Sequence, residues 1–238
     1  MQRLKWRRAR LGLWAIVAAC GAWTAGAASP SNTAPDANQA TGANAPAVGK
    51  PTPLDRYLDD MRTLRATFQQ TLTDAHGREI DRARGTLIVV RPGKFSWEIH
   101  PQGSGTGQLM VADGRNLWFL DRDLQQVTVK PIDAALSATP AMLLSGTIDV
   151  RRSFKMTPAG ERDGLDWVLV EPQGAEADFR RALLGFDGDE LKRMILEDKL
   201  GQTASVIFDH VERNGHVAPE EVAFVPPPGV DVIGTPRK

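Results

Sequence analysis

The stretch RGTLIVVRPGKFSWEIHP, residues 84 to 101, decides the fold of this chain. It begins with an apolar run that ends at Val90, passes Arg91, and turns at Pro92 and Gly93. Beyond the turn, every second position is apolar, at Phe95, Trp97 and Ile99. Such alternation is typical of a strand with one buried face. The stretch therefore predicts two strands joined by a turn, with an arginine at the rim of an apolar sheet.

Short alternating runs of the same kind continue along the chain, and turn dipeptides separate them. The dipeptides are Asp113-Gly114, Asp163-Gly164, Asp187-Gly188 and Asn214-Gly215. Asp-Gly and Asn-Gly are strong short-range signals for β-hairpins. Strands at spacings of about 10 to 15 residues, with no βαβ pattern between them, predict a mainly β fold. We expect an antiparallel meander that curls toward a barrel.

Two segments have helical signals instead. Thr52 can cap a helix that starts at Pro53, and Asp55 stands at the capping-box position. Apolar residues then recur at helical spacing, at Leu54, Tyr57, Leu58, Met61 and Leu64. The second segment, PIDAALSATPAMLLSG at 131 to 146, predicts a short apolar helix from Pro140 that Gly146 ends. Such helices can cover the open side of a curved sheet; the alternative is ordinary packing on a core.

The N-terminus has the pattern of an export signal. Five basic residues precede an apolar run of about 13 residues, too short to span a bilayer, and an A-x-A cleavage pattern follows at Ala25 and Ala27. We therefore expect a signal peptide at 1–27, a disordered Pro/Ala-rich leader at 28–51 and one folded domain at 52–238. An alternative is lipidation of Cys20, because Val17 to Cys20 also forms a loose lipobox.

Charge and composition exclude several functional classes. Removal of residues 1–27 leaves 24 of the 29 basic residues against 29 acidic ones, which disfavours nucleic-acid binding. The four histidines have no metal-ligand spacing, and a chain cut after Ala27 has no cysteine, so we expect no metal and no cofactor. GSGTG at 103–107 fits a flexible loop better than a phosphate cradle. We expect a protein that is not an enzyme.

Five consecutive motifs carry a resemblance to a known family. They are RPGKFSWE at 91–98, VADGRNLWFLDRDLQQVTV at 111–129, TPAMLLSG at 139–146, DKLGQTASVIF at 198–208 and FVPPPGVDVIG at 224–234. Together they resemble LolA, the periplasmic lipoprotein carrier of the Lol system. The resemblance implies an unclosed antiparallel β-barrel of about eleven strands with an α-helical lid. It also implies an apolar cavity for the acyl chains of outer-membrane lipoproteins, and a Gly-rich loop at 102–107 that is longer than is usual for the family.

The same resemblance implies partners and a role for Arg91. The partners are lipoproteins released by an inner-membrane ABC exporter and an outer-membrane receptor that accepts them, and the carrier is expected to be a monomer. Arg91 matches the family's arginine that bonds backbone carbonyls of the lid helices, so it is expected to act as a latch; on the residues alone it fits an exposed turn arginine. As residues that line the cavity we predict Trp97, Leu109, Trp118, Met142, Leu143 and Leu144, each of which fits a structural core equally well.

Two alternative functions stay open at this point. The first is an outer-membrane lipoprotein receptor of similar fold, resembling LolB, acylated on Cys20 and tethered by the leader. The second is a hydrolase that uses His100 or His210 as its base.

Overall fold

The computed structural model describes residues 51–132, 140–146, 150–174, 177 and 179–237. The predicted signal peptide, almost all of the predicted leader and Thr139 lie outside these residues. The helices are α1 (Pro53–Asp60), α2 (Pro140–Ser145), α3 (Val150–Ser153) and the 3₁₀ helix η3 (Pro219–Val222). The strands are β1 (Thr63–Thr73), β2 (Glu79–Val90), β3 (Lys94–Pro101), β4 (Gln108–Asp113), β5 (Asn116–Asp121), β6 (Gln126–Pro131), β7 (Phe154–Arg162), β8 (Leu165–Pro172), β9 (Phe179–Asp187), β10 (Glu190–Asp198), β11 (Thr203–Arg213) and β12 (Asp231–Ile233).

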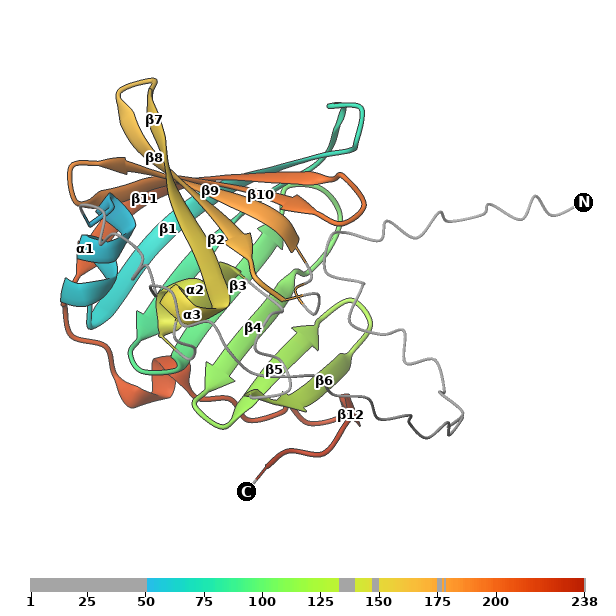
Figure 1. Cartoon of the computed structure of the whole chain (residues 1–238). Helices are drawn as coiled ribbons and strands as arrows, with labels where there is room; N and C mark the ends of the chain where they lie inside the picture. Colours follow the sequence, from blue (N-terminus) through green and yellow to red (C-terminus); the bar gives the residue numbers. More distant parts are fainter. Residues whose placement is uncertain (1–50, 133–139, 147–149, 175–176, 178, 238) are drawn as a thin grey trace, which may run out of the picture. The chain divides into compact units, whose positions relative to one another are not determined.

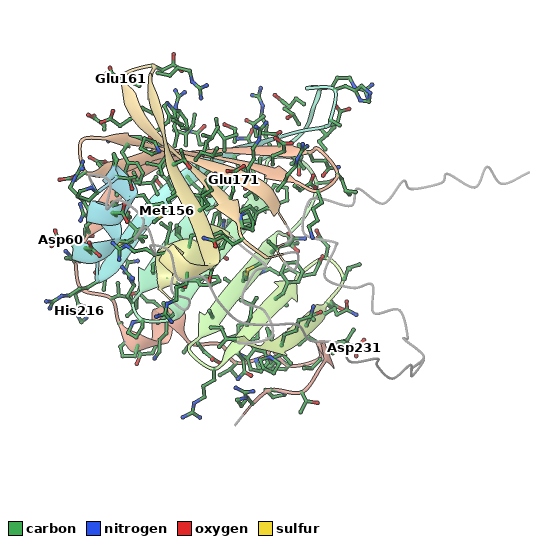
Figure 2. All side chains as sticks on the ribbon, viewed as in Figure 1. Asp60, Met156, Glu161, Glu171, His216 and Asp231 are labelled. Atoms are coloured by element: carbon green, nitrogen blue, oxygen red, sulfur yellow. The ribbon has the colours of Figure 1, made fainter. Side chains whose placement is uncertain are left out.

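The described strands form one twelve-stranded sheet in the order β12-β6-β5-β4-β3-β2-β1-β11-β10-β9-β8-β7 (Figure 1). Neighbours run antiparallel, apart from β12, which pairs parallel with β6. The two end strands, β7 and β12, do not pair with each other, so hydrogen bonds do not close the sheet. Figure 2 shows Glu161 of β7 and Asp231 of β12 at widely separated ends of it. The expected mainly β, unclosed fold is confirmed, with β12 as a strand beyond the expected eleven.

Three of the four predicted hairpin turns join neighbouring strands, at β4–β5, β7–β8 and β9–β10. Asp163 and Gly164 both have positive φ, 56° and 72°, as a two-residue turn of the I′ type requires. The prediction is wrong for Asn214, because no hairpin follows β11. Instead Asn214 Oδ1 accepts a hydrogen bond from the Arg62 N–H at 2.7 Å, and this bond ties the end of β11 to the start of β1.

The capping box of α1 forms as the sequence predicts. The Asp55 N–H donates to Thr52 Oγ1 at 3.1 Å, and the Thr52 N–H donates to Asp55 Oδ2 at 2.9 Å. The helix nevertheless ends at Asp60, and Leu64 lies buried in β1. Leu64 fitted the helical spacing only by coincidence, because it also begins the alternation of β1.

Both faces of the sheet carry buried apolar residues. Paired residues in an antiparallel sheet point to the same face. The register therefore places on one face, here called the inner face, the buried residues Leu64, Phe68, Leu87, Val89, Phe95, Trp97, Met110, Val168, Leu184, Met194, Val206 and Phe208. In Figure 1, α2 and α3 lie in front of this part of the sheet. The opposite, outer face is packed by the C-terminal segment, residues 214–237, over β2 to β6.

Candidate functional site

The centre of the inner face is an aromatic cluster. Trp97 is 2% exposed, and its ring meets that of Phe68 edge to face, with centroids 5.4 Å apart. Phe68 also contacts Phe208. Gly85 leaves room for this cluster, since a Cβ there would lie 2.6 Å from a Phe68 ring atom and would overlap the Glu98 carbonyl oxygen. The cluster presents a continuous apolar surface in the middle of the sheet.

Helix α2 covers part of this surface. It packs against β2 and β3, and its Leu143 and Leu144 are 0% exposed. The side chain of Met142, which we also predicted to line the cavity, lies outside the described residues. Of the predicted lining residues, Trp97, Leu143 and Leu144 are therefore the ones placed in the buried region between sheet and helices.

Leu109 and Trp118, which we predicted to line the same cavity as Trp97, lie on the outer face instead. Trp97 pairs with Met110, whereas Leu109 pairs with Glu98 and therefore points the other way. Trp118 packs against Phe224 of the C-terminal segment, with ring centroids 5.3 Å apart. The alternation could not reveal this, because strands β4 and β5 bury apolar residues on both faces.

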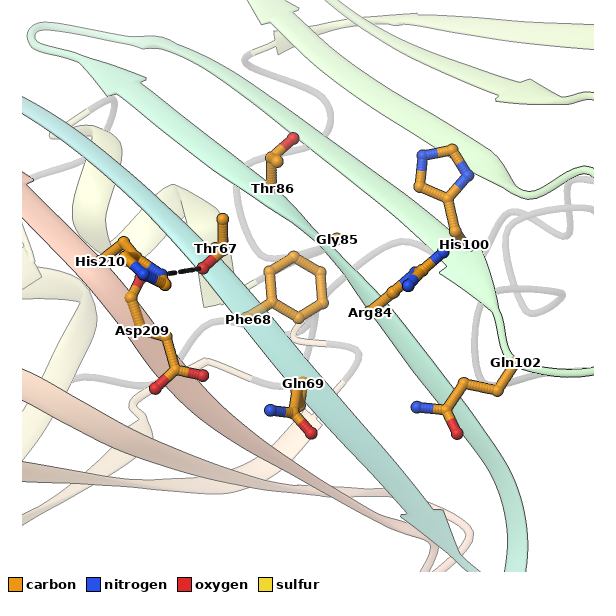
Figure 3. A pocket seen from close by; sticks show the side chains of 10 residues that line it. All are labelled: Thr67, Phe68, Gln69, Arg84, Gly85, Thr86, His100, Gln102, Asp209 and His210. Atoms are coloured by element: carbon orange, nitrogen blue, oxygen red, sulfur yellow. Dashed lines mark hydrogen bonds between the residues drawn. The ribbon is translucent and has the colours of Figure 1, made fainter.

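A groove of about 520 Å³, lined mostly by polar residues, also lies on the outer face, over β1, β2, β3 and β11 (Figure 3). Arg84 and His100 pair across β2 and β3 at one side of it. At the other side, the Thr67 hydroxyl lies 3.2 Å from His210 Nδ1. Both histidines named for a hydrolase thus lie across the sheet from Trp97. The described residues contain no cluster of three or more potential metal ligands.

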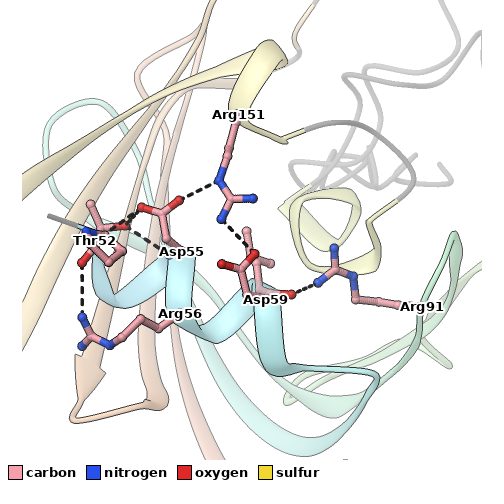
Figure 4. Close-up of polar contacts among 8 residues, drawn as sticks. Thr52, Asp55, Arg56, Asp59, Arg91 and Arg151 are labelled. Atoms are coloured by element: carbon pink, nitrogen blue, oxygen red, sulfur yellow. Dashed lines mark hydrogen bonds and ion pairs between the residues drawn. The ribbon is translucent and has the colours of Figure 1, made fainter. Parts of the chain in front are cut away.

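Arg91 lies in the turn between β2 and β3, where this turn meets two helices. Its N–H donates to the Arg62 carbonyl at 2.8 Å, and the Gly93 N–H donates to the carbonyl of Ser145 in α2 at 2.8 Å. Its guanidinium Nη1 donates to the carbonyl of Leu58 in α1, close to Asp59 (Figure 4). The turn therefore bonds both α1 and α2 to the sheet.

Gly146 shapes the space that the Arg91 guanidinium occupies. It follows α2 with φ +68°, and a Cβ at this position would lie 2.5 Å from Arg91 Nε and 2.8 Å from Nη2. Burial is the main cause that lowers the pKa of Arg91; nearby Asp59 opposes this shift and Arg151 adds to it. An arginine remains charged despite such a shift, so a partly buried cation rests on two helix ends.

Sequence reasoning did not find Asp59, Arg151 or the contact of Gly146 with Arg91. Asp59 and Arg151 form an ion pair of 2.9 Å between α1 and α3. The sequence contained one signal for these contacts. The last two residues of α1 are acidic, and acidic side chains are unfavourable at the C-terminal end of a helix. That placement indicates that cations from elsewhere in the fold lie nearby.

An unclosed antiparallel sheet with short helices over an apolar inner face defines a class, the lidded open β-barrels. No helix among the described residues is both long and apolar enough to span a membrane. The profile of the family described as outer membrane lipoprotein carrier protein LolA matches residues 59–225. The chain belongs to this family.

Two relatives of known name agree with this assignment. The outer-membrane lipoprotein carrier protein of Dechloromonas aromatica is 39% identical over 181 residues, which cover 76% of this chain and 86% of the relative. That of Methylobacillus flagellatus is 38% identical over 181 residues, with 76% and 87% covered. A solved LolA superfamily protein from Nitrosomonas europaea is similar to this chain with a TM-score of 0.41 and 11% identity, over 72% of this chain and 96% of that one.

Proposed function

We propose that this protein is a periplasmic carrier that holds the acyl chains of outer-membrane lipoproteins against its inner face. It takes lipoproteins released by an inner-membrane ABC exporter and delivers them, as a monomer, to an outer-membrane receptor. The observation that carries the proposal is the apolar inner face around Trp97, covered by helices that the Arg91 turn holds. Family membership supports the kind of cargo.

The chemistry of the cargo explains why such a surface is needed. Leaving an acyl chain of about 16 carbons in water costs on the order of 0.8 kcal/mol per CH₂ group, so a lipidated protein does not cross an aqueous space unaided. A carrier must also release its cargo, so its affinity has to be limited. An inner face that helices cover when it is empty meets this requirement, because the cargo must then compete with closure. This is binding without catalysis.

Within residues 51–238 the chain has three tryptophans, and they provide the test. Trp97 lies on the inner face, while Trp118 lies under the C-terminal segment and Trp167 lies beside Arg162. Three variants that each keep one of these tryptophans are titrated with a fatty acid brominated near the middle of its chain, which quenches indoles that it contacts. We expect quenching of Trp97 alone.

Equal quenching of Trp118, or no quenching of Trp97 in a folded variant, contradicts the proposed site.

The alternative of a LolB-like receptor rests on the lipobox-like residues Val17 to Cys20. Radiolabelled palmitate in the mature protein favours that alternative, whereas a soluble periplasmic product that begins at Ala28 or Ser29 favours the carrier.

A further inference from the structure

The C-terminal end of α1 carries the charge that a helix end disfavours. Asp59 and Asp60 occupy it, and the last turn contains no basic residue. The exposed carbonyls of a helix C-terminus give it a partial negative charge, so acidic residues there are destabilising. α1 has eight residues, and isolated helices shorter than about 12 to 15 residues are marginal in water. Its stability must therefore come from the groups on which it docks.

Three arginines from three other elements surround this end of α1. Arg91 donates to the Leu58 carbonyl from the β2–β3 turn. Arg213, near the end of β11, lies 3.5 Å from the Asp60 carboxylate. The third is Arg151 of α3, which bonds both carboxylates of one side of the helix: its Nη2 donates to Asp59 Oδ1 at 2.9 Å and its Nε to Asp55 Oδ1 at 3.0 Å (Figure 4).

The electrostatics of these groups agree with the geometry. The hydrogen bond to Asp59 is the main cause that raises the pKa of Arg151, and Asp55 adds to it. Arg151 is half exposed and Asp59 is more exposed still, so water and salt reach this pair. Arg91 differs, because it bonds a neutral carbonyl and is partly buried. The two arginines therefore hold α1 from two sides by interactions with different sensitivity to salt.

We propose that Arg151 is a second latch residue, an ionic one that ties α3 to α1 so that both helices close over the inner face as one unit. The inference rests on the proposed function in its consequence for cargo: removal of the tie destabilises the closed form, and the affinity for an acyl chain rises with the fraction of open protein. Exposed ion pairs contribute little to stability, so we expect an effect of about threefold in Arg151→Gln, below that of Arg91.

The experiment combines ligand binding with amide hydrogen exchange of α1, on the mature chain at low salt. Arg151→Gln should bind a fluorescent fatty acid about threefold more tightly than wild type and should exchange the α1 amides faster without ligand. Both differences should disappear in about 1 M salt, where the Debye length is roughly 3 Å. Arg151→Lys should fall between the two proteins, since one ammonium replaces a guanidinium that serves two carboxylates.

Two controls separate the tie from general destabilisation. Asp59→Asn should change both readouts in the same direction as Arg151→Gln but by less, because Arg151 keeps its bond to Asp55. The double variant should be no more affected than Arg151→Gln alone, and Asp59, unlike Asp55, takes no part in the capping box. Arg78→Gln removes an exposed ion pair with Asp74 in the β1–β2 turn and should change neither readout. Unchanged α1 exchange in folded Arg151→Gln overturns the inference, whether or not any ligand binds. Failure of wild type to bind the fatty acid overturns the proposed function instead.

Discussion

At the residue scale, the helices that cover the inner face are held by hydrogen bonds from the turn that contains Arg91. Its guanidinium reaches the Leu58 carbonyl, and the neighbouring Gly93 N–H reaches Ser145, so a single turn meets two helices. The sequence placed Arg91 at the rim of a sheet, but only its resemblance to a family gave it a partner. Side chains distant in sequence, such as that of Arg151, could not be assigned at all, because nothing local encodes which carboxylate an exposed arginine meets.

Arg91→Leu tests the proposed latch. Charge-assisted hydrogen bonds to carbonyls contribute about 2 kcal/mol, so loss of a bond made only in the closed form should tighten fatty-acid binding by about 30-fold. Transfer of a labelled lipoprotein from purified carrier to receptor-containing membranes should then be poor although loading survives. Arg91→Lys should restore transfer in part. Normal transfer by folded Arg91→Leu would show that Arg91 is a turn residue without a latch role.

Gly146→Ala should disturb the same contact from the other side. The new Cβ meets the Arg91 guanidinium, and an alanine with φ +68° is strained by about 1 kcal/mol. We expect a loss of about 2 to 3 kcal/mol of unfolding free energy and a tighter complex with the fatty acid. Gly164→Ala is the matched control, since Gly164 has φ +72° and nothing within 4 Å of a Cβ. If denaturant titrations give the same loss for both variants, the contact with Arg91 is unimportant.

At the scale of elements, α1 was predictable at its start and not at its end. Thr52, Pro53 and Asp55 form a local signal that the helix fulfils. Its end was misjudged because Leu64 continued a helical spacing while belonging to β1. Strands β4 to β6 gave the larger error. Their alternation is real, but it does not say which face is the inner one, because the proline-rich C-terminal segment buries apolar residues on the outer face as well.

The capping box makes the stability of α1 dependent on pH. Burial acts to raise the pKa of Asp55, but hydrogen bonds from Thr52 and Arg151 outweigh it and lower the pKa below its ordinary value of 3.8. The stabilising effect is therefore present above that value and is lost as pH falls through the lower pKa of the folded state. Asp55→Asn should cost about 1 kcal/mol at neutral pH, and this cost should shrink progressively in denaturant titrations as the pH falls below 3.8. A cost for Asp55→Asn that stays constant as the pH falls would contradict this role of the carboxylate.

The C-terminal segment should stabilise the sheet through Phe224. Its ring packs on Trp118, and it belongs to the outer apolar cluster of Val111, Leu120, Val127 and Val129. Phe224→Ala should lower the unfolding free energy by about 1 to 3 kcal/mol, below the cost for a fully buried phenylalanine. Val225, the next residue, is 83% exposed, so Val225→Ala should change it by less than about 0.5 kcal/mol. Equal melting temperatures for wild type and Phe224→Ala would show that the segment merely lies on the sheet.

At the scale of the whole molecule, the fold class was the most predictable property. Alternating runs and turn dipeptides suffice to predict an antiparallel meander, because both signals are local. Whether the sheet closes is not local, since it depends on the pairing of strands at the two ends of the chain. Strand β12 pairs with β6 in parallel over three residues, and no pattern in residues 224–234 predicts this pairing.

A sheet that stays open leaves two rows of backbone groups without strand partners, and such rows invite other chains to add themselves. Two features of β7 disfavour pairing of this edge with another chain. Pro158 lacks an N–H, and the register is irregular between Pro158 and Glu161. Lys155, Glu161 and Arg162 add exposed charges along the same strand. On the other side, β12 offers a foreign strand no more than three residues. An open barrel can thus remain accessible to an apolar ligand without acting as a template for polymerisation.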